Sequence, residues 1–66
     1  MDFDYARAEI LTPEGLGKRL GLSRRWVIIH SRPDAVDPIP HLKLGRVPRY
    51  AWGSPELSAW LQRRQR

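Results

Sequence analysis

Arginine is the residue type in this chain whose number and spacing are best suited to binding chemistry. Ten of the twelve basic residues are arginine, and two of them, Arg24 and Arg25, are adjacent. The planar guanidinium carries its N–H donors in a fixed fork that matches phosphate groups and other planar acceptors. Residues 1–11 hold three acidic residues against one basic residue, so the net charge of +5 places +7 on the remaining 55 residues. This balance favours a polyanionic partner, although charge alone also fits a membrane surface or simple solubility.

Residues that could support catalysis or bind a metal are few and scattered. His30 and His41 have no cysteine near them, because the chain contains none, and Asp34 and Asp37 lie in a proline-bounded segment typical of turns. A chain of 66 residues forms one domain with a core too small to surround a catalytic pocket. We therefore expect no enzyme activity, no metal and no cofactor.

The elements that would position the arginines begin with a helix over residues 13–20. Thr12-Pro13-Glu14 is typical of a helix start, because it supplies a cap, a proline without an unpaired N–H, and a negative charge at the positive end of the dipole. Two leucines four residues apart give this helix a buried face. Gly15 and Gly17 each cost about 1 kcal/mol relative to alanine, so tertiary packing must hold the helix in place.

A second helix is predicted after a three-residue turn. Gly21 suits a left-handed cap on the first helix, and Ser23 can cap a helix that runs from Arg24 to about Ser31. A helix, a three-residue turn and another helix have the spacing of a helix-turn-helix. The residue before Pro33 is biased away from helix, so residues 33–40 are expected to form a loop.

The next segment predicts a short hairpin. Leu42 and Leu44 alternate with polar residues as in a half-buried strand, Gly45-Arg46 supplies the turn, and residues 47–50 supply the return strand. Pro48 cannot donate to a ladder, which predicts an edge position for the return strand.

A last helix and the core complete the predicted fold. Ser54-Pro55-Glu56 repeats the helix-start chemistry, and apolar residues follow on one face. At least two of the three tryptophans are expected in the core, since each can bury a large apolar area. Val27 is expected in the core and Trp26 partly buried against the hairpin. Positive charge would gather at the solvated end of the chain, on Arg63, Arg64 and Arg66.

Five segments occur in a characteristic order: Thr12-Pro13-Glu14, Leu20-Gly21-Leu22-Ser23-Arg24-Arg25, Ile39-Pro40-His41-Leu42-Lys43-Leu44-Gly45-Arg46, Arg49-Tyr50 and Glu56-Leu57-Ser58-Ala59-Trp60-Leu61. Together they resemble the MerR-like and excisionase-like winged helix-turn-helix family, over residues 10–63. The resemblance implies a mainly α fold with a small two-stranded hairpin, the wing, and a C-terminal helix. Ile28-Ile29 and His30-Ser31 depart from it, because relatives often have polar, aromatic or basic residues at the first pair and an apolar anchor at the second.

The resemblance also implies a function. Family members are small DNA-binding proteins of phages, prophages and integrative elements, and many are excisionases, or recombination directionality factors, that act beside an integrase. Others are transcriptional regulators. Larger MerR-type members continue into a dimerising helix, whereas this sequence ends after its last short helix and so resembles the excisionase type. The expected partners are double-stranded DNA, a tyrosine or serine integrase and further copies of the chain.

The second helix is expected to enter the major groove. Arg24 and Arg25 in its first turn can bind guanine O6 and N7; a solvated helix start is the alternative, although positive charge there opposes the dipole. Ser23 is either a plain cap or a cap that also binds a phosphate. Arg32 would lie near a phosphate at the far end of the helix. Ile28 or Ile29 can contact a thymine methyl, and one of them can equally mark a contact with a neighbouring protein molecule.

The hairpin and the first helix are expected to bind the DNA backbone beside the base contacts. Arg46 at the tip of the turn can enter a narrow minor groove, while Lys43 and Arg49 can bind phosphates on either side of it. The alternative is that the hairpin turn is exposed to solvent and its arginine does not contact DNA. Thr12, at the start of the first helix, would be a further phosphate contact.

We predict an acidic tail over residues 1–9 and a winged helix-turn-helix domain over residues 10–66. One copy covers too little DNA to be selective, so several copies would bind repeated sites cooperatively and bend the DNA. Phe3 and Tyr5 of the tail could dock on the next copy. The alternatives are a transcriptional regulator, the DNA-recognition part of a phage packaging complex and, from another class, a protein-interaction module that uses Ile28-Ile29. No apolar run reaches the length of a membrane span and the acidic start lacks the features of a signal peptide, so we expect a cytoplasmic protein at the nucleoid.

Overall fold

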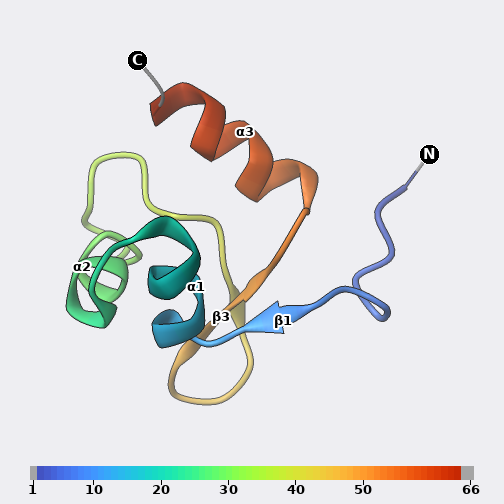
Figure 1. Ribbon diagram of the computed structural model, residues 1–66, viewed down its shortest axis with the longest axis horizontal. Coiled ribbons are helices and arrows are strands. Elements are labelled where there is room, and N and C mark those ends of the chain that lie inside the picture. The colour runs from blue at the N-terminus through green and yellow to red at the C-terminus, as the bar shows by residue number, and fades with distance from the viewer. Residues whose placement is uncertain (1, 65–66) are drawn as a thin grey trace.

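The computed structural model describes residues 2–64, so Arg66 of the predicted basic end lies outside the described residues. Within them the chain forms three helices and a three-stranded antiparallel sheet, a mixed fold in place of the mainly helical one with a hairpin (Figure 1). In chain order the elements are β1 (Ile10–Leu11), α1 (Pro13–Leu20), α2 (Arg24–Ile29), β2 (Leu42–Lys43), β3 (Pro48–Ala51) and α3 (Pro55–Arg64). Figure 1 shows α1 and α2 side by side, with α3 at the end of the molecule opposite to the β2–β3 loop.

Helix α1 and the turn after it form as their sequence predicts. The Thr12 hydroxyl accepts a hydrogen bond from the Gly15 N–H at 3.0 Å, and Gly21 closes the helix in the left-handed region with φ of 71°. The Ser23 hydroxyl accepts from the Trp26 N–H at 3.0 Å and so caps α2. Gly17 is needed for a close approach, because a Cβ at this position would lie 2.6 Å from the backbone oxygen of Leu22. The helix and the turn therefore pack backbone to backbone.

Helix α2 is two residues shorter than predicted. It ends at Ile29, and the N–H of Ser31 bonds to the Ile28 carbonyl at 3.1 Å, a tight last turn that stops the α-helical pattern. The loop that follows returns to this point, since the Ile39 N–H donates to the His30 carbonyl at 2.9 Å. The predicted loop over residues 33–40 is thus held against the end of α2.

The sheet differs from the predicted two-stranded hairpin. Its order is β1-β3-β2, with Leu11 opposite Tyr50 on one side of β3 and Leu42 opposite Arg49 on the other. β3 is therefore the central strand, and the predicted edge position was wrong. Pro48 is tolerated because it is the first residue of β3 and pairs only with Lys43, beyond the two residues of β1. Leu44 was also expected to be half-buried, but it follows β2 and is 57% exposed.

The core lies between the sheet and the helices and contains one fully buried tryptophan rather than two. Trp60 is 2% exposed and packs with buried aliphatic residues and Tyr50, while Trp26 and Trp52 are partly buried against this cluster. Val27 is buried as predicted. Trp26 does not pack against the hairpin, because it stacks on His30 with 3.8 Å between the ring centroids and lines a hollow with residues of α1 and α3.

The acidic N-terminal segment is bound to its own fold. The backbone carbonyl of Glu9 accepts from the Trp52 N–H at 2.9 Å, its carboxylate pairs with Arg19, and the Tyr5 hydroxyl donates to the Glu56 carboxylate. Residues 2–9 therefore lie beside the start of α3 and the end of α1. The aromatic side chains proposed to dock on another copy make their contacts within the same chain.

A candidate nucleic-acid interface

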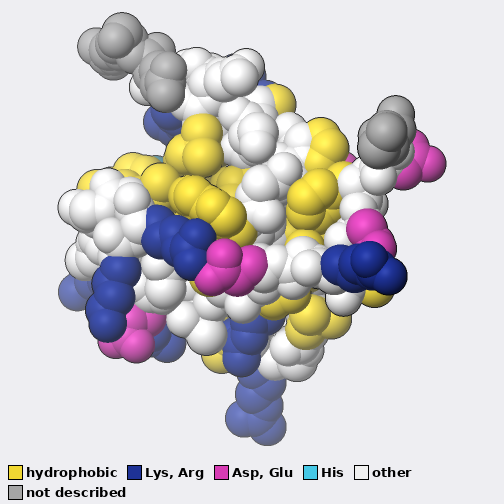
Figure 2. All heavy atoms as spheres, turned by 45° about the vertical axis from the view of Figure 1, so that its right-hand side comes forward, with side chains coloured by type: hydrophobic (Ala, Val, Ile, Leu, Met, Phe, Trp, Pro, Cys, Tyr) yellow, Lys and Arg dark blue, Asp and Glu magenta, His cyan; other side chains and the backbone are white. Residues whose placement is uncertain are grey.

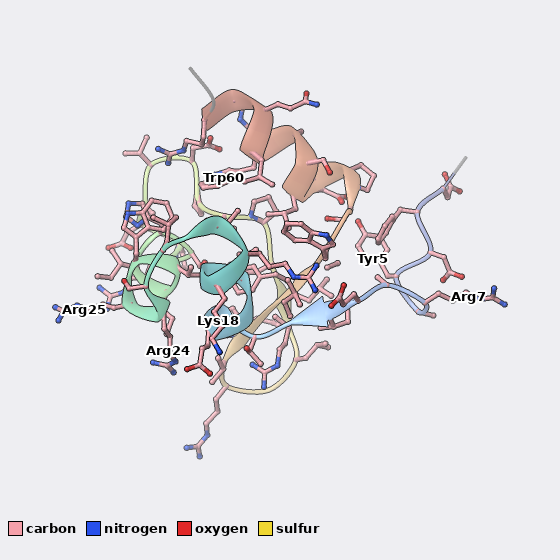
Figure 3. All side chains as sticks on the ribbon, viewed as in Figure 1. Tyr5, Arg7, Lys18, Arg24, Arg25 and Trp60 are labelled. Carbon is pink, nitrogen blue, oxygen red and sulfur yellow. The ribbon has the colours of Figure 1, made fainter. Side chains whose placement is uncertain are left out.

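The predicted recognition residues lie on one flank and on the outer face of α2. Arg24 and Arg25 are exposed and point away from the core, whereas Val27 is fully buried (Figure 3). Because successive helical residues are about 100° apart, Arg24 and Ile28 share a flank, Arg25 lies on the outer face, and Trp26 lies on the opposite flank. The helix thus presents its arginines to solvent while Val27 holds it to the core.

A first hollow joins three of the predicted residues from separate parts of the chain. It has a volume of about 240 Å³, and the residues that line it are Thr12, Pro13, Glu14, Arg24, Val47 and Arg49. The start of α1, the start of α2 and the beginning of β3 therefore meet here. Arg49 donates to the carbonyls of Val47 and Pro48, both at 3.3 Å, which holds its guanidinium along the strand.

A second hollow lies between the end of α2 and the hairpin. It has a volume of about 170 Å³ and is lined by Ile28, Ser31, Arg32, Pro33, His41, Lys43 and Pro48. Ile28, Arg32 and Lys43 were predicted as contact residues from different elements, and the fold brings them together. Ser23, Arg25 and Arg46 line neither hollow: Ser23 caps α2, Arg25 lies on its outer face, and Arg46 is exposed in the β2–β3 loop.

The charges on this surface are not neutralised by ion pairs. Among residues 2–64 the ion pairs join Arg7 to Asp4, Arg19 to Glu9 and Arg63 to Asp37, and none involves a predicted contact residue. Figure 2 shows basic side chains projecting at the end of the molecule where Figure 1 places the β2–β3 loop. Two carboxylates lie close to this surface, Glu14 in the first hollow and Asp34 in the loop after Arg32. The surface remains positive overall, because its basic side chains outnumber these two carboxylates.

The capping hydroxyls can also serve this surface. Thr12 and Ser23 each use the oxygen as an acceptor for a backbone N–H, which leaves the hydroxyl hydrogen free to donate. An anion at the start of either helix could accept that hydrogen bond.

Ser31 is a structural residue of the site that the sequence analysis missed. It is 4% exposed, and its hydroxyl donates to the Val27 carbonyl at 2.7 Å and lies 2.6 Å from the Tyr50 hydroxyl. Since the single Ser31 hydrogen goes to Val27, the Tyr50 hydroxyl is the donor to Ser31. Burial raises the pKa of Tyr50, so the phenol stays neutral. This chain of hydrogen bonds fixes the end of α2 against β3, and the spacing of Ser31 four residues after the buried Val27 could have indicated it.

Comparison with protein-family models, with curated proteins and with solved structures finds no match to this chain. Within residues 2–64, no helix is long and apolar enough to cross a membrane. The same residues contain no cluster of three or more side chains suited to bind a metal ion.

Proposed function

We propose that this chain is a sequence-specific DNA-binding domain of the winged helix-turn-helix type. The observation that carries the proposal is the meeting of Arg24, Arg49, Arg32 and Lys43, without carboxylate partners among residues 2–64, in two hollows where α2 adjoins the hairpin. A basic surface with one exposed helix beside a short hairpin fits a duplex, whose phosphates lie on both sides of the groove that the helix enters.

In this arrangement α2 provides the base contacts. Arg25, on the outer face of the helix, and Arg24, beside it, bind guanine through paired N–H donors. Ile28 contacts a thymine methyl from the same flank. Arg32, just beyond the helix, binds a phosphate.

The hairpin and the helix caps hold the DNA backbone. Arg46 reaches from the β2–β3 loop into the minor groove, while Lys43 and Arg49 bind phosphates on either side of it. The hydroxyls of Thr12 and Ser23 donate to phosphates at the starts of α1 and α2.

The biological role proposed is that of an excisionase, a recombination directionality factor. A module of this size buries roughly 600–1,000 Å² on DNA, which is too little for selectivity in a genome, so several copies bind neighbouring repeats cooperatively and bend the DNA. A tyrosine or serine integrase is the proposed partner on that DNA. A small transcriptional regulator would use the same surface, and the two roles differ in where the sites lie.

The position of the sites is therefore the decisive measurement. Purified protein is mixed at moderate salt with fragmented DNA of its source organism, and the bound fragments are recovered and sequenced. Clustered direct repeats beside an integrase gene or an attachment site would support the excisionase role, and promoter sites would support the regulator. No enrichment over input DNA would overturn the proposed function and favour a protein-interaction module.

A further inference from the structure

An apolar groove runs along the other flank of α2. Its lining comes from the end of α1, the turn, α2 and α3, and consists of Leu20, Leu22, Trp26, Trp60, Leu61 and Arg64. The groove has a volume of about 470 Å³, and Figure 2 shows apolar side chains gathered on the surface beneath α3. Leu22 is 38% exposed although its side chain is large and apolar. The chain thus leaves an apolar surface open to solvent.

The surface beyond this groove is partly apolar and partly charged. A neighbouring hollow shares Arg64 with it and is lined also by Ile29, His30, Arg32, Asp34, Ala35 and Val36. Val36 is 90% exposed and Ile29 is 38% exposed, while the His30 ring is stacked on Trp26. Because Arg32 is a proposed phosphate contact and Asp34 would repel an acidic ligand, a ligand in the groove is expected to reach no further than Val36.

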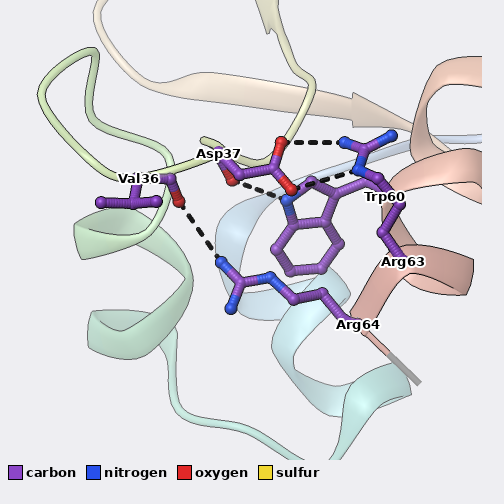
Figure 4. Close-up of polar contacts among 5 residues, drawn as sticks. All are labelled: Val36, Asp37, Trp60, Arg63 and Arg64. Atoms are coloured by element: carbon purple, nitrogen blue, oxygen red, sulfur yellow. Dashed lines mark hydrogen bonds and ion pairs between the residues drawn. The ribbon is translucent and has the colours of Figure 1, made fainter. Parts of the chain in front are cut away.

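The charge in the groove identifies the chemistry of the ligand. The Arg64 guanidinium lies 5.0 Å from the centre of the Trp60 ring and donates to the Val36 carbonyl at 3.4 Å (Figure 4). Its neighbour Arg63 is already paired with Asp37, at 2.9 Å, but Arg64 has no carboxylate partner among residues 2–64. No acidic side chain lines the groove. A guanidinium stacked on one face keeps N–H donors at its edge for an incoming carboxylate.

We propose that this groove binds an acidic amphipathic helix of another protein. The apolar face of that helix packs on Leu22, Trp26 and Leu61, and a glutamate or aspartate on its border pairs with Arg64. A helix supplies apolar side chains at three- and four-residue spacing, which suits a groove lined by apolar residues of three helices and a turn.

A second copy of the chain is a poorer ligand for the groove than an acidic helix. A symmetric pair would bring two Arg64 side chains together and repel. The acidic segment of this chain, residues 2–9, is already held on its own fold through Glu9 and Tyr5. The exposed face of α3 carries Glu56, Ala59 and Gln62 and offers no apolar ridge.

The groove and the proposed DNA surface occupy different flanks of α2. Arg24 and Ile28 lie on one flank and Trp26 on the other, so a duplex and a partner helix can be bound together. This simultaneous binding rests on the proposed function, whereas binding in the groove does not.

The test uses a synthetic amphipathic peptide of about 18 residues, with leucines on one face and glutamates beside them, and a matched peptide in which every glutamate is lysine. Binding is followed by NMR through the indole N–H signals, with Trp52 as an internal reference because it does not line the groove. We expect the acidic peptide to shift the Trp26 signal with micromolar affinity and the lysine peptide to bind about tenfold more weakly or not at all.

Three variants sharpen the test. Leu22→Glu should abolish binding of the acidic peptide, and Leu44→Glu, a matched change at an exposed leucine of the hairpin, should leave it unchanged. Arg64→Glu should reverse the preference in favour of the lysine peptide. Equal binding of both peptides, binding that survives Leu22→Glu, or a failure of both peptides to bind would overturn the proposal, as would self-association of the chain abolished by Leu22→Glu.

Adding a duplex separates the two proposals. Peptide affinity that stays the same when DNA is bound would support simultaneous binding, and competition would overturn it. A chain that binds peptide but not DNA would contradict the proposed function alone. A chain that binds DNA but neither peptide would contradict the groove alone.

Discussion

Replacing Arg25 and Lys43 separately by alanine distinguishes base recognition from backbone attraction. Arg25 lies on the outer face of α2, whereas Lys43 lies in β2 at the edge of the second hollow. A guanidinium bound to guanine contributes about 1–3 kcal/mol of discrimination, so Arg25→Ala should narrow the preference for matched over scrambled DNA by roughly 5- to 150-fold. Lys43→Ala should weaken both duplexes to the same degree.

The dependence of DNA affinity on salt concentration gives a second, independent quantity to measure. The proposed surface contains six basic side chains, namely Arg24, Arg25, Arg32, Lys43, Arg46 and Arg49. If about four to six phosphates are neutralised, the logarithm of affinity should fall with the logarithm of salt with a slope of about −4 to −5. Loss of one phosphate contact in Lys43→Ala should make this slope shallower by about 0.9.

The assay is fluorescence anisotropy on a labelled duplex taken from the enriched genomic fragments, repeated with a scrambled duplex over a range of salt. Arg7→Ala is the matched control, because it removes the same charge from a side chain that is 89% exposed and lies far from Arg24 and Arg25 (Figure 3). It should change neither the preference nor the slope. Equal losses on matched and scrambled DNA for Arg25→Ala and Lys43→Ala would refute the division of roles, and a flat salt dependence of the unmodified protein would refute the basic surface.

Three further predictions concern the scaffold and are tested by thermal and urea unfolding. Gly17→Ala should destabilise the fold by about 1–3 kcal/mol, because the new Cβ would lie 2.6 Å from a backbone oxygen. In Gly15→Ala the new Cβ meets only side chains, the nearest atom being 3.3 Å away, so this variant should be close to neutral. Equal stability of the two variants would contradict the close approach at Gly17. Tyr50→Phe should cost about 1 kcal/mol by removing the hydrogen bond to Ser31. Since burial raises the pKa of Tyr50, its contribution to stability should be constant below about pH 10 and be lost as the pH rises through the raised value. The hydrogen bond to Glu56 raises the pKa of Tyr5 too, so the alkaline fall in stability should become smaller in Tyr50→Phe without vanishing, and an unchanged fall would contradict the effect of burial. The hydrogen bond from Arg63 lowers the pKa of Asp37, so the stability that this pair contributes should be present above about pH 4 and be lost on further acidification. An Asp37→Asn protein whose stability falls with acid in the same way as that of the unmodified chain would refute this.

The helix boundaries that the sequence predicted well are those set by neighbouring residues. Thr12 and Ser23 cap their helices through hydrogen bonds that span three residues, and Gly21 ends α1 by its own backbone conformation. The helix over residues 13–20 was therefore predicted with both of its boundaries correct. Ser54 caps the start of α3 in the same way, since its hydroxyl accepts a hydrogen bond from the Leu57 N–H at 3.3 Å.

The features that the sequence did not predict depend on residues far apart in the chain. β1 has only two residues, too few for a periodic pattern, and exists because Ile10 and Leu11 pair with Ala51 and Tyr50. Gly17 was assigned only a propensity cost, since its contact with Leu22 requires the folded turn. The candidate contact residues were named from charge and position, but their meeting in two hollows required the sheet to place Arg49 and Lys43 beside α2.

The shortness of α2 explains how one helix can present two different surfaces. In six residues only Val27 is fully buried, so the helix cannot hide both of its flanks. Its position is instead fixed by the backbone contact at Gly17 before it and by the Ser31 hydrogen bonds after it. Because these anchors lie outside the helix, the core uses its flanks only in part: Arg24 is exposed and available to the proposed polyanion, and Trp26, partly buried against the core, still lines the groove for the proposed apolar ligand. A longer helix packed along its whole length would need one of these flanks for the core.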